Sequence, residues 1–238
     1  PIDDDVGLVQ VMADAGLKVM QLTYNNLSLI GAGCAELDDP GISRFGREVI
    51  AEMNRAGMVI DMSHSAERTT LEAIELSRRP VAVTHANPRF FKDTPRNKSD
   101  KVLAALGETG GMLGFSLYPP HLAHGADTTL EAFTGMVARA AEIAGVRNLG
   151  IGSDMCRGWD GRTIDWMRNG RWRQVPEAER AEFADMPWPS QPDWFRTPAD
   201  TPNLATGLRA RGFSAEEVDG LMGDNWARFL RDALEPES

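Results

Sequence analysis

The sequence has 238 residues, of which 42% are apolar and 25% are charged, as in a globular protein with a sizeable core. Its formal net charge of −10 argues against a nucleic-acid-binding surface, which needs clustered lysine and arginine. No apolar run is long enough to cross a bilayer, and no basic-then-apolar signal segment opens the chain. Two cysteines make no disulfide framework, so we expect a cytoplasmic protein.

Helical and strand patterns alternate along the chain. The first pair is VGLVQVMADAG followed by KVMQLT. In the second, apolar positions over 45–56 share one face of a helix that Ser43 can cap, and the run MVIDMS follows. A helix over 65–79 precedes VAVT, and Ser99 can cap a helix that precedes MLGFSLY. The last helix, over 130–144, precedes LGIGS.

The pattern predicts five strands, which begin near Val19, Met58, Val81, Met112 and Leu149. Strands that alternate with helices are parallel and are joined by right-handed crossovers. Two architectures are compatible with this: an open doubly wound sheet, or part of an eight-stranded barrel. Both gather their chemistry at the carboxyl ends of the strands. Those ends carry polar side chains here: Thr23-Tyr24-Asn25, Ser63-His64, Thr84-His85, Tyr118 and Ser153-Asp154.

Residues 156–202 break the alternation. Five of the six tryptophans lie in this stretch among many prolines, so we expect an insertion folded over the rest of the protein rather than a free linker. A capping-box pattern over 214–217 then starts a helix. Its apolar side would carry Val218, Leu221, Met222, Trp226 and Phe229. We expect one domain over 1–238.

Two of the four histidines stand at equivalent places in successive units, because His64 ends MVIDMSH and His85 ends VAVTH. Neutral imidazole is a good zinc ligand, and side chains at neighbouring strand ends point into the same mouth. The alternative is two hydrogen-bonded histidines in a polar rim. Asp154, at a third strand end, favours the metal site, since a carboxylate there can act as ligand or as acid/base. Its alternative role is a helix cap or a turn.

Other candidates are weaker. Arg96, in the loop TPRNKSD, suits bidentate contact with a carboxylate, although an isolated arginine is usually a surface residue. His121 and His124 follow two prolines, so a solvated loop is favoured over a metal pair. Cys156 has no matched base nearby in the sequence, and we expect it to be structural. No Walker loop, G-x-G-x-x-G or G-x-S-x-G motif is present, which argues against cofactor-dependent redox chemistry and serine hydrolysis.

Seven segments occur in one characteristic order: QLTYNN, GISRFGREVIAEMNRAGMVIDMSHS, RPVAVTHAN, PRN, GGMLGFSLYP, LGIGSDM and EEVDGLMGDNWARFL. Together they resemble the membrane (renal) dipeptidase family, peptidase family M19. The resemblance runs from about Leu17 to Phe229 and is weakest in the tryptophan-rich insertion. It implies a metallo-dependent hydrolase with a (β/α)8 TIM-barrel fold and two zinc ions at the carboxyl mouth.

The resemblance also implies roles for individual residues. His64 and His85 would both bind one of the zinc ions. Asp154 would be the catalytic acid/base and touch the substrate, and Arg96 would hold the terminal carboxylate of a dipeptide. A hydroxide that bridges the two cations would attack the peptide carbonyl. A homodimer is a further expectation, since homodimers are common in the family.

The chain departs from the family pattern in two ways. It lacks the H-x-D motif of the first strand and the bridging glutamate of the third, so it would cover roughly strands four to eight, lack the N-terminal strands, and supply ligands mainly for one zinc. Where the family often has a substrate-polarising histidine in L-T-H-N, this sequence has Tyr24, whose hydroxyl could still donate a hydrogen bond to substrate.

The favoured function is therefore a zinc-dependent dipeptidase acting on small dipeptides. One alternative is a non-catalytic or truncated homologue that binds a peptide or partner. Another is a related amidohydrolase that acts on a lactam or cyclic amide.

Overall fold

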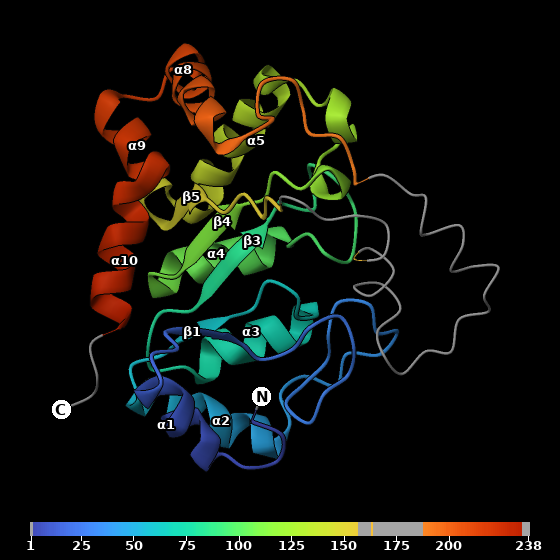
Figure 1. Cartoon of the computed structure of the whole chain (residues 1–238), viewed down its shortest axis with the longest axis vertical. Coiled ribbons are helices and arrows are strands. Elements are labelled where there is room, and N and C mark those ends of the chain that lie inside the picture. Colours follow the sequence, from blue (N-terminus) through green and yellow to red (C-terminus); the bar gives the residue numbers. More distant parts are fainter. Residues whose placement is uncertain (1, 157–162, 164–187, 235–238) are drawn as a thin grey trace.

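The structure is a computed structural model that describes residues 2–156, 163 and 188–234, and Figure 1 shows their arrangement. Five helix-then-strand units follow one another along the chain. Their elements are α1 (Gly7–Asp14), β1 (Val19–Gln21), α2 (Arg44–Arg55), β2 (Val59–Asp61), α3 (Glu67–Leu76), β3 (Ala82–Ala86), α4 (Asp100–Thr109), β4 (Met112–Phe115), α5 (Leu130–Ala144) and β5 (Leu149–Ile151). All five strands begin within one residue of the predicted positions.

The strands form one parallel sheet in the order β1-β2-β3-β4-β5. A doubly wound sheet reverses its strand order at a switch point, whereas a barrel keeps its strands in chain order. Consecutive helices also contact one another in chain order, from α1 through α5 to α8 (Thr201–Arg211). The doubly wound alternative is therefore wrong, and the five units form an arc of a barrel-type fold.

Local chemistry explains why the helices begin and end where they do. The Ser43 hydroxyl accepts a hydrogen bond from the Gly46 amide at 2.9 Å, and Ser99 caps α4 in the same way. Helix α3 is shorter than the predicted 65–79. It stops at Leu76 because the Ser77 hydroxyl turns to the main chain of Arg79, donating to its carbonyl at 2.7 Å.

The C-terminal helix is not continuous, so the prediction of a single helix is wrong. The capping box of Ser214 and Glu217 is present and starts α9 (Ala215–Asp219). A π-helical segment, η5 (Gly220–Asp224), then separates α9 from α10 (Asn225–Ala233). The Asn225 amide donates to the carbonyls of Val146 and Leu149 at 2.9 Å, which fixes α10 against β5. Apolar residues of α10 pack on the first residues of three strands: Val59, Ala82 and Met112.

Most of the predicted 156–202 insertion lies outside the described residues. Its described end packs on α5, because Trp194 lies 5.3 Å from the Phe133 ring and donates from Nε1 to the Thr128 carbonyl at 2.7 Å. Phe195 beside it is buried. Over the parts of the chain that are described, no helix has the length and apolar character needed to cross a membrane.

Two glycines allow the strands to converge beside the candidate site. A Cβ atom on Gly114 would lie 2.1 Å from the Thr84 carbonyl oxygen, and one on Gly152 would lie 1.8 Å from it. No side chain fits at either distance. The ends of β4 and β5 therefore approach β3 closely at Thr84, the residue before His85.

Candidate metal and substrate site

A cavity of about 350 Å³ opens at the carboxyl ends of the strands. Of the residues that the sequence predicted, Tyr24, His64, Arg96 and Asp154 line it. The remaining lining residues are Asn25, Cys34, Ala35, Pro95, Tyr118, Pro120 and His121. His85 lies against His64, so the structure brings all five predicted residues to one site.

The two histidine rings face each other with their Nε2 atoms. His64 follows β2, His85 lies in β3, and their Nε2 atoms are 3.1 Å apart. The ring planes are inclined by 62°. This confirms the prediction that neighbouring strand ends direct these two side chains into one mouth.

A buried carboxylate sets the tautomer of His85. Asp61 accepts the hydroxyl protons of both Ser63, at 2.5 Å, and Thr84, at 2.7 Å. Because the Thr84 hydroxyl donates its proton to Asp61, it can only accept a hydrogen bond from His85 Nδ1, which lies 2.7 Å away. His85 therefore carries its hydrogen on Nδ1, and its Nε2 atom presents a lone pair.

The Asn25 side chain sets the tautomer of His64. The Asn25 side-chain oxygen lies 2.8 Å from His64 Nδ1, and an amide oxygen only accepts hydrogen bonds. The hydrogen of His64 is therefore also on Nδ1. Two Nε2 lone pairs then face each other without a proton between them, an arrangement that a bound cation stabilises.

The geometry fits two ligands of one metal ion. Two nitrogens bound to a tetrahedral zinc at its usual bond length would lie about 3.3 Å apart, close to the 3.1 Å between these Nε2 atoms. Burial, and then the charge of Arg96, lowers the pKa of both His64 and His85, which keeps them neutral as metal ligands must be. Among the described residues no group of three or more histidine, cysteine, aspartate or glutamate side chains is placed to hold a metal ion.

Arg96 is tied to both histidine-bearing strand ends. Its Nη1 atom donates to the Ser63 carbonyl, and its Nη2 atom donates to the His85 carbonyl at 2.8 Å. Arg96 is thus a half-buried cation at the cavity wall rather than the usual surface arginine. Its guanidinium has five N–H donors, so others remain for a bound carboxylate.

Asp154 follows β5 and lines the cavity. Its backbone is in the left-handed region at φ 53°, which aspartate tolerates better than most residues. Burial raises the pKa of its carboxyl, while His85 and Arg96 act in the opposite direction. A carboxyl with a raised pKa is better matched to proton transfer near neutral pH.

Tyr24 covers His64 at the mouth of the cavity. The two rings stack with centroids 4.1 Å apart and planes inclined by 26°. Burial, and then Asp154, raises the pKa of the Tyr24 hydroxyl, so it stays protonated and remains a hydrogen-bond donor.

His121 is not in a solvated loop, so that prediction is wrong. It ends a 3-10 turn, η1 (Pro119–His121), is 7% exposed and lines the cavity. The Ser116 hydroxyl accepts a hydrogen bond from the Tyr118 backbone amide and lies 2.8 Å from His121 Nδ1, which holds the imidazole in place. Burial lowers the pKa of His121 to about 2, which leaves a neutral imidazole. His124 does not line this cavity.

Sequence reasoning placed Asn25 at a strand end without a role, and it missed Asp61 and His121. Asp61 offered a signal, because an acidic residue inside the apolar run MVIDMS needs buried hydrogen-bond donors. His121 offered none, because it follows two prolines in a polar stretch.

A model of the membrane dipeptidase family, peptidase family M19, matches residues 1–166. The chain belongs to this family. An uncharacterized dipeptidase of Schizosaccharomyces pombe is 30% identical over 222 residues, which cover 92% of this chain and 47% of that protein. The chain thus spans about half the length of this relative.

Two solved structures share the fold. An amidohydrolase from Pseudomonas aeruginosa superimposes with a TM-score of 0.88 at 35% identity, covering 98% of this chain and 70% of that one. A metallo peptidase from Rhodobacter sphaeroides, liganded with a phosphinate mimic of the dipeptide L-Ala-D-Ala, gives a TM-score of 0.77 at 21% identity and covers 97% and 60% of the two chains. The fold is of the (β/α)8 TIM-barrel type. The cytoplasmic location and the homodimer stay predictions.

Proposed function

We propose that this M19 chain is part of a zinc-dependent dipeptidase that hydrolyses the peptide bond of small dipeptides. The observation that carries the proposal is the 3.1 Å between the Nε2 atoms of His64 and His85, beside a cavity that Arg96 and Asp154 also line. Family membership supports it, as does the fold shared with a peptidase that was solved with a dipeptide mimic.

His64 and His85 would hold one ion through their Nε2 atoms. When bound, zinc supplies a Lewis acid that lowers the pKa of water and polarises a carbonyl group. The intact site would hold two such ions, and the described residues offer ligands mainly for one. Asn25 and Thr84 would keep the two imidazoles in the tautomer that exposes Nε2.

The charges in the cavity suit a dipeptide zwitterion. The Arg96 guanidinium would bind the terminal carboxylate, because its fork of N–H groups matches the two carboxylate oxygens. Tyr24 would add a neutral donor for a substrate oxygen, since its hydroxyl keeps its hydrogen. A cavity of about 350 Å³ is at the small end of the range for ligand sites, which suits a dipeptide better than a longer peptide.

Asp154 would move the proton. It would accept a hydrogen from the attacking water as the new C–O bond forms at the peptide carbonyl. It would then deliver that proton to the amine nitrogen as the C–N bond breaks, so that the carboxylate is regenerated. The raised pKa of Asp154 favours both halves of this exchange near neutral pH.

The His85→Ala variant tests the proposal, with His124→Ala as the matched control because His124 does not line the cavity. In the full-length protein, His85→Ala should lose bound zinc and dipeptide hydrolysis while its circular dichroism stays unchanged. His124→Ala should keep both. A normal zinc content in the His85→Ala variant would contradict the proposal.

A second candidate is hydrolysis of a lactam or cyclic amide, favoured by the similarity to the amidohydrolase from Pseudomonas aeruginosa. Arg96 distinguishes the two, because a cyclic amide without a carboxylate gives it no partner. A panel of dipeptides and lactams should show turnover of dipeptides only. Turnover of lactams alone would favour the second candidate, and zinc binding without any turnover would indicate a non-catalytic homologue.

A further inference from the structure

Cationic side chains hold the main chain on both sides of His64. Arg96 donates to the carbonyl of Ser63, the residue before His64. Lys98 donates from Nζ to the carbonyl of Ser65, the residue after it, at 2.7 Å. Arg96 and Lys98 are two residues apart in the sequence. One short segment therefore forms hydrogen bonds to the main chain on both sides of His64.

The same segment is fixed to the strand that carries His85. The Lys98 amide donates to the Asn87 carbonyl at 2.9 Å, and the Lys98 carbonyl accepts from the Arg89 amide at 2.7 Å. Asn87 is two residues beyond His85. Lys98 therefore joins the turn after β2 to the turn after β3 through its side chain and its main chain respectively.

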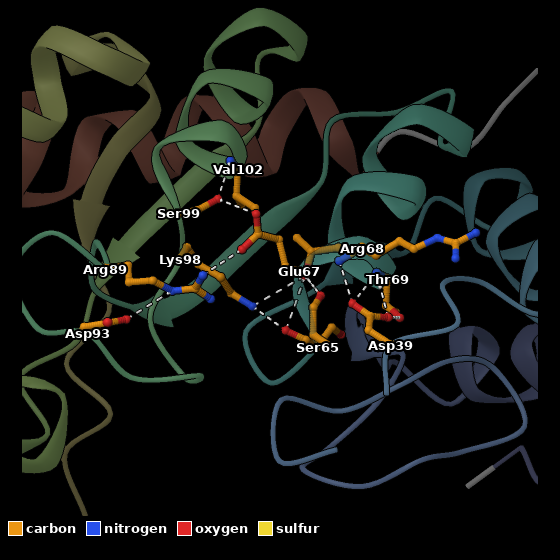
Figure 2. Close-up of polar contacts among 12 residues, drawn as sticks. Asp39, Ser65, Glu67, Arg68, Thr69, Arg89, Asp93, Lys98, Ser99 and Val102 are labelled. Carbon is orange, nitrogen blue, oxygen red and sulfur yellow. Dashed lines mark hydrogen bonds and ion pairs between the residues drawn. The ribbon is translucent and has the colours of Figure 1, made fainter. Parts of the chain in front are cut away.

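Figure 2 shows the Lys98 amine directed at the Ser65 carbonyl, and among the described residues no carboxylate forms an ion pair with it. Its second contact is a hydroxyl, Thr70 Oγ1, at 3.5 Å. Glu67, the first residue of α3, is occupied elsewhere, since it accepts from Arg89 at 2.9 Å and from Ser99 at 3.0 Å. Lys98 is 3% exposed, and in the described part of the chain its amine bonds to neutral oxygens alone.

Such a placement is unfavourable for folding. A buried ammonium without a carboxylate loses its hydration and gains little in return. The pKa of Lys98 falls to about 7, chiefly through burial and then through repulsion by Arg96. An apolar side chain of the same length would fill this position at lower cost. What lysine adds is the bond to the Ser65 carbonyl.

We propose that Lys98 is a positioning residue for the metal site, which holds the His64 turn at the distance from β3 that lets both Nε2 atoms reach one ion. This inference rests on the proposed zinc function. It assigns Lys98 no contact with substrate or metal.

The test is Lys98→Met in the full-length protein, with Lys101→Met as the control, because Lys101 is an exposed lysine of α4. Zinc is titrated calorimetrically into the metal-free proteins, and thermal unfolding is followed for each. Lys98→Met should raise the zinc Kd about tenfold or more, the range seen when supporting residues of metal sites are removed. Its melting temperature without metal should stay equal or rise, and its KM at saturating zinc should not change. Lys101→Met should match the unmodified protein in every measurement.

Opposite effects on zinc affinity and stability separate positioning from a merely structural role, which would weaken both together. An unchanged zinc Kd in Lys98→Met would overturn the inference while leaving the proposed function intact. Weaker zinc binding accompanied by a lower melting temperature would also overturn it. If the unmodified protein binds no zinc, the proposed function fails first and this inference fails with it.

Discussion

The Thr84 hydroxyl lies 2.7 Å from His85 Nδ1 and 2.7 Å from the Asp61 carboxylate. Because Asp61 takes the hydroxyl proton, Thr84 must accept the imidazole hydrogen. A single hydroxyl thus decides which nitrogen of His85 is free to bind a metal. The close approach of Gly114 and Gly152 to the Thr84 carbonyl holds that residue in place.

Thr84→Val should therefore weaken zinc binding by about tenfold, because it removes the acceptor that keeps the hydrogen on Nδ1. Thr134→Val is the matched control: Thr134 is also buried, but its hydroxyl donates to the Glu131 carbonyl on α5. Calorimetric zinc titration of the metal-free proteins measures the difference. Equal affinities for the two variants would show that the tautomer is not set by Thr84.

The Arg96→Met variant should lose the discrimination between a dipeptide and its C-terminal amide. We expect KM for the free dipeptide to rise between about tenfold and hundredfold at saturating zinc, since a charge-assisted hydrogen bond is lost. KM for the amide should change little. If both substrates are affected equally, Arg96 acts through its bonds to Ser63 and His85 rather than through the carboxylate.

Tyr24→Phe removes the hydroxyl and keeps the ring that stacks on His64. If the hydroxyl polarises the substrate carbonyl, kcat should fall about tenfold or more, with zinc content and KM nearly unchanged. Tyr24→His, which restores a donor, should retain more activity than Tyr24→Phe. Steady-state kinetics of the two variants would refute this role if kcat were the same in Tyr24→Phe as in the unmodified protein.

Lys98 should make stability depend on pH. Its pKa is about 7 in the folded protein and near its ordinary value of about 10.4 in the unfolded chain, so the unfolded chain binds more protons between these values. The free energy of unfolding should then rise from pH 7 to pH 10, by up to roughly 1.4 kcal/mol per pH unit from this group. Below pH 7 the penalty is complete and constant.

Neighbouring charges also shift the pKa of Lys98, namely those of Arg96, Cys34, Asp61 and Arg89. The contribution of the Lys98 amine is therefore measured as the difference in unfolding free energy between the unmodified protein and Lys98→Met. Urea unfolding at each pH should show the variant more stable at pH 7, with the gap closing toward pH 10. A gap that does not vary with pH would mean that the amine titrates normally.

Periodicity and caps predicted the fold well because they depend on local chemistry. Apolar runs placed every strand, and Ser43 and Ser99 cap helices as expected. The break in the C-terminal helix was not predictable from its apolar face. It depends on Asn225 reaching carbonyls beside β5, nearly 80 residues earlier in the chain.

A site residue was predictable only where its side chain is a typical metal ligand and it also stands at the carboxyl end of a strand. His64 and His85 satisfy both conditions. His121 does not, since two prolines before a polar stretch are typical of an exposed turn, and only the folded chain shows that this turn is buried on Ser116. Lys98 was equally hidden, because lysine in a polar loop normally points into solvent.

Zinc-edge anomalous diffraction from crystals of the full-length protein grown with zinc tests whether His64 and His85 bind one ion. We expect a peak within about 2.0–2.1 Å of the Nε2 atoms of both residues. A zinc-loaded crystal with no peak between those two rings, or with the rings turned apart, would contradict it.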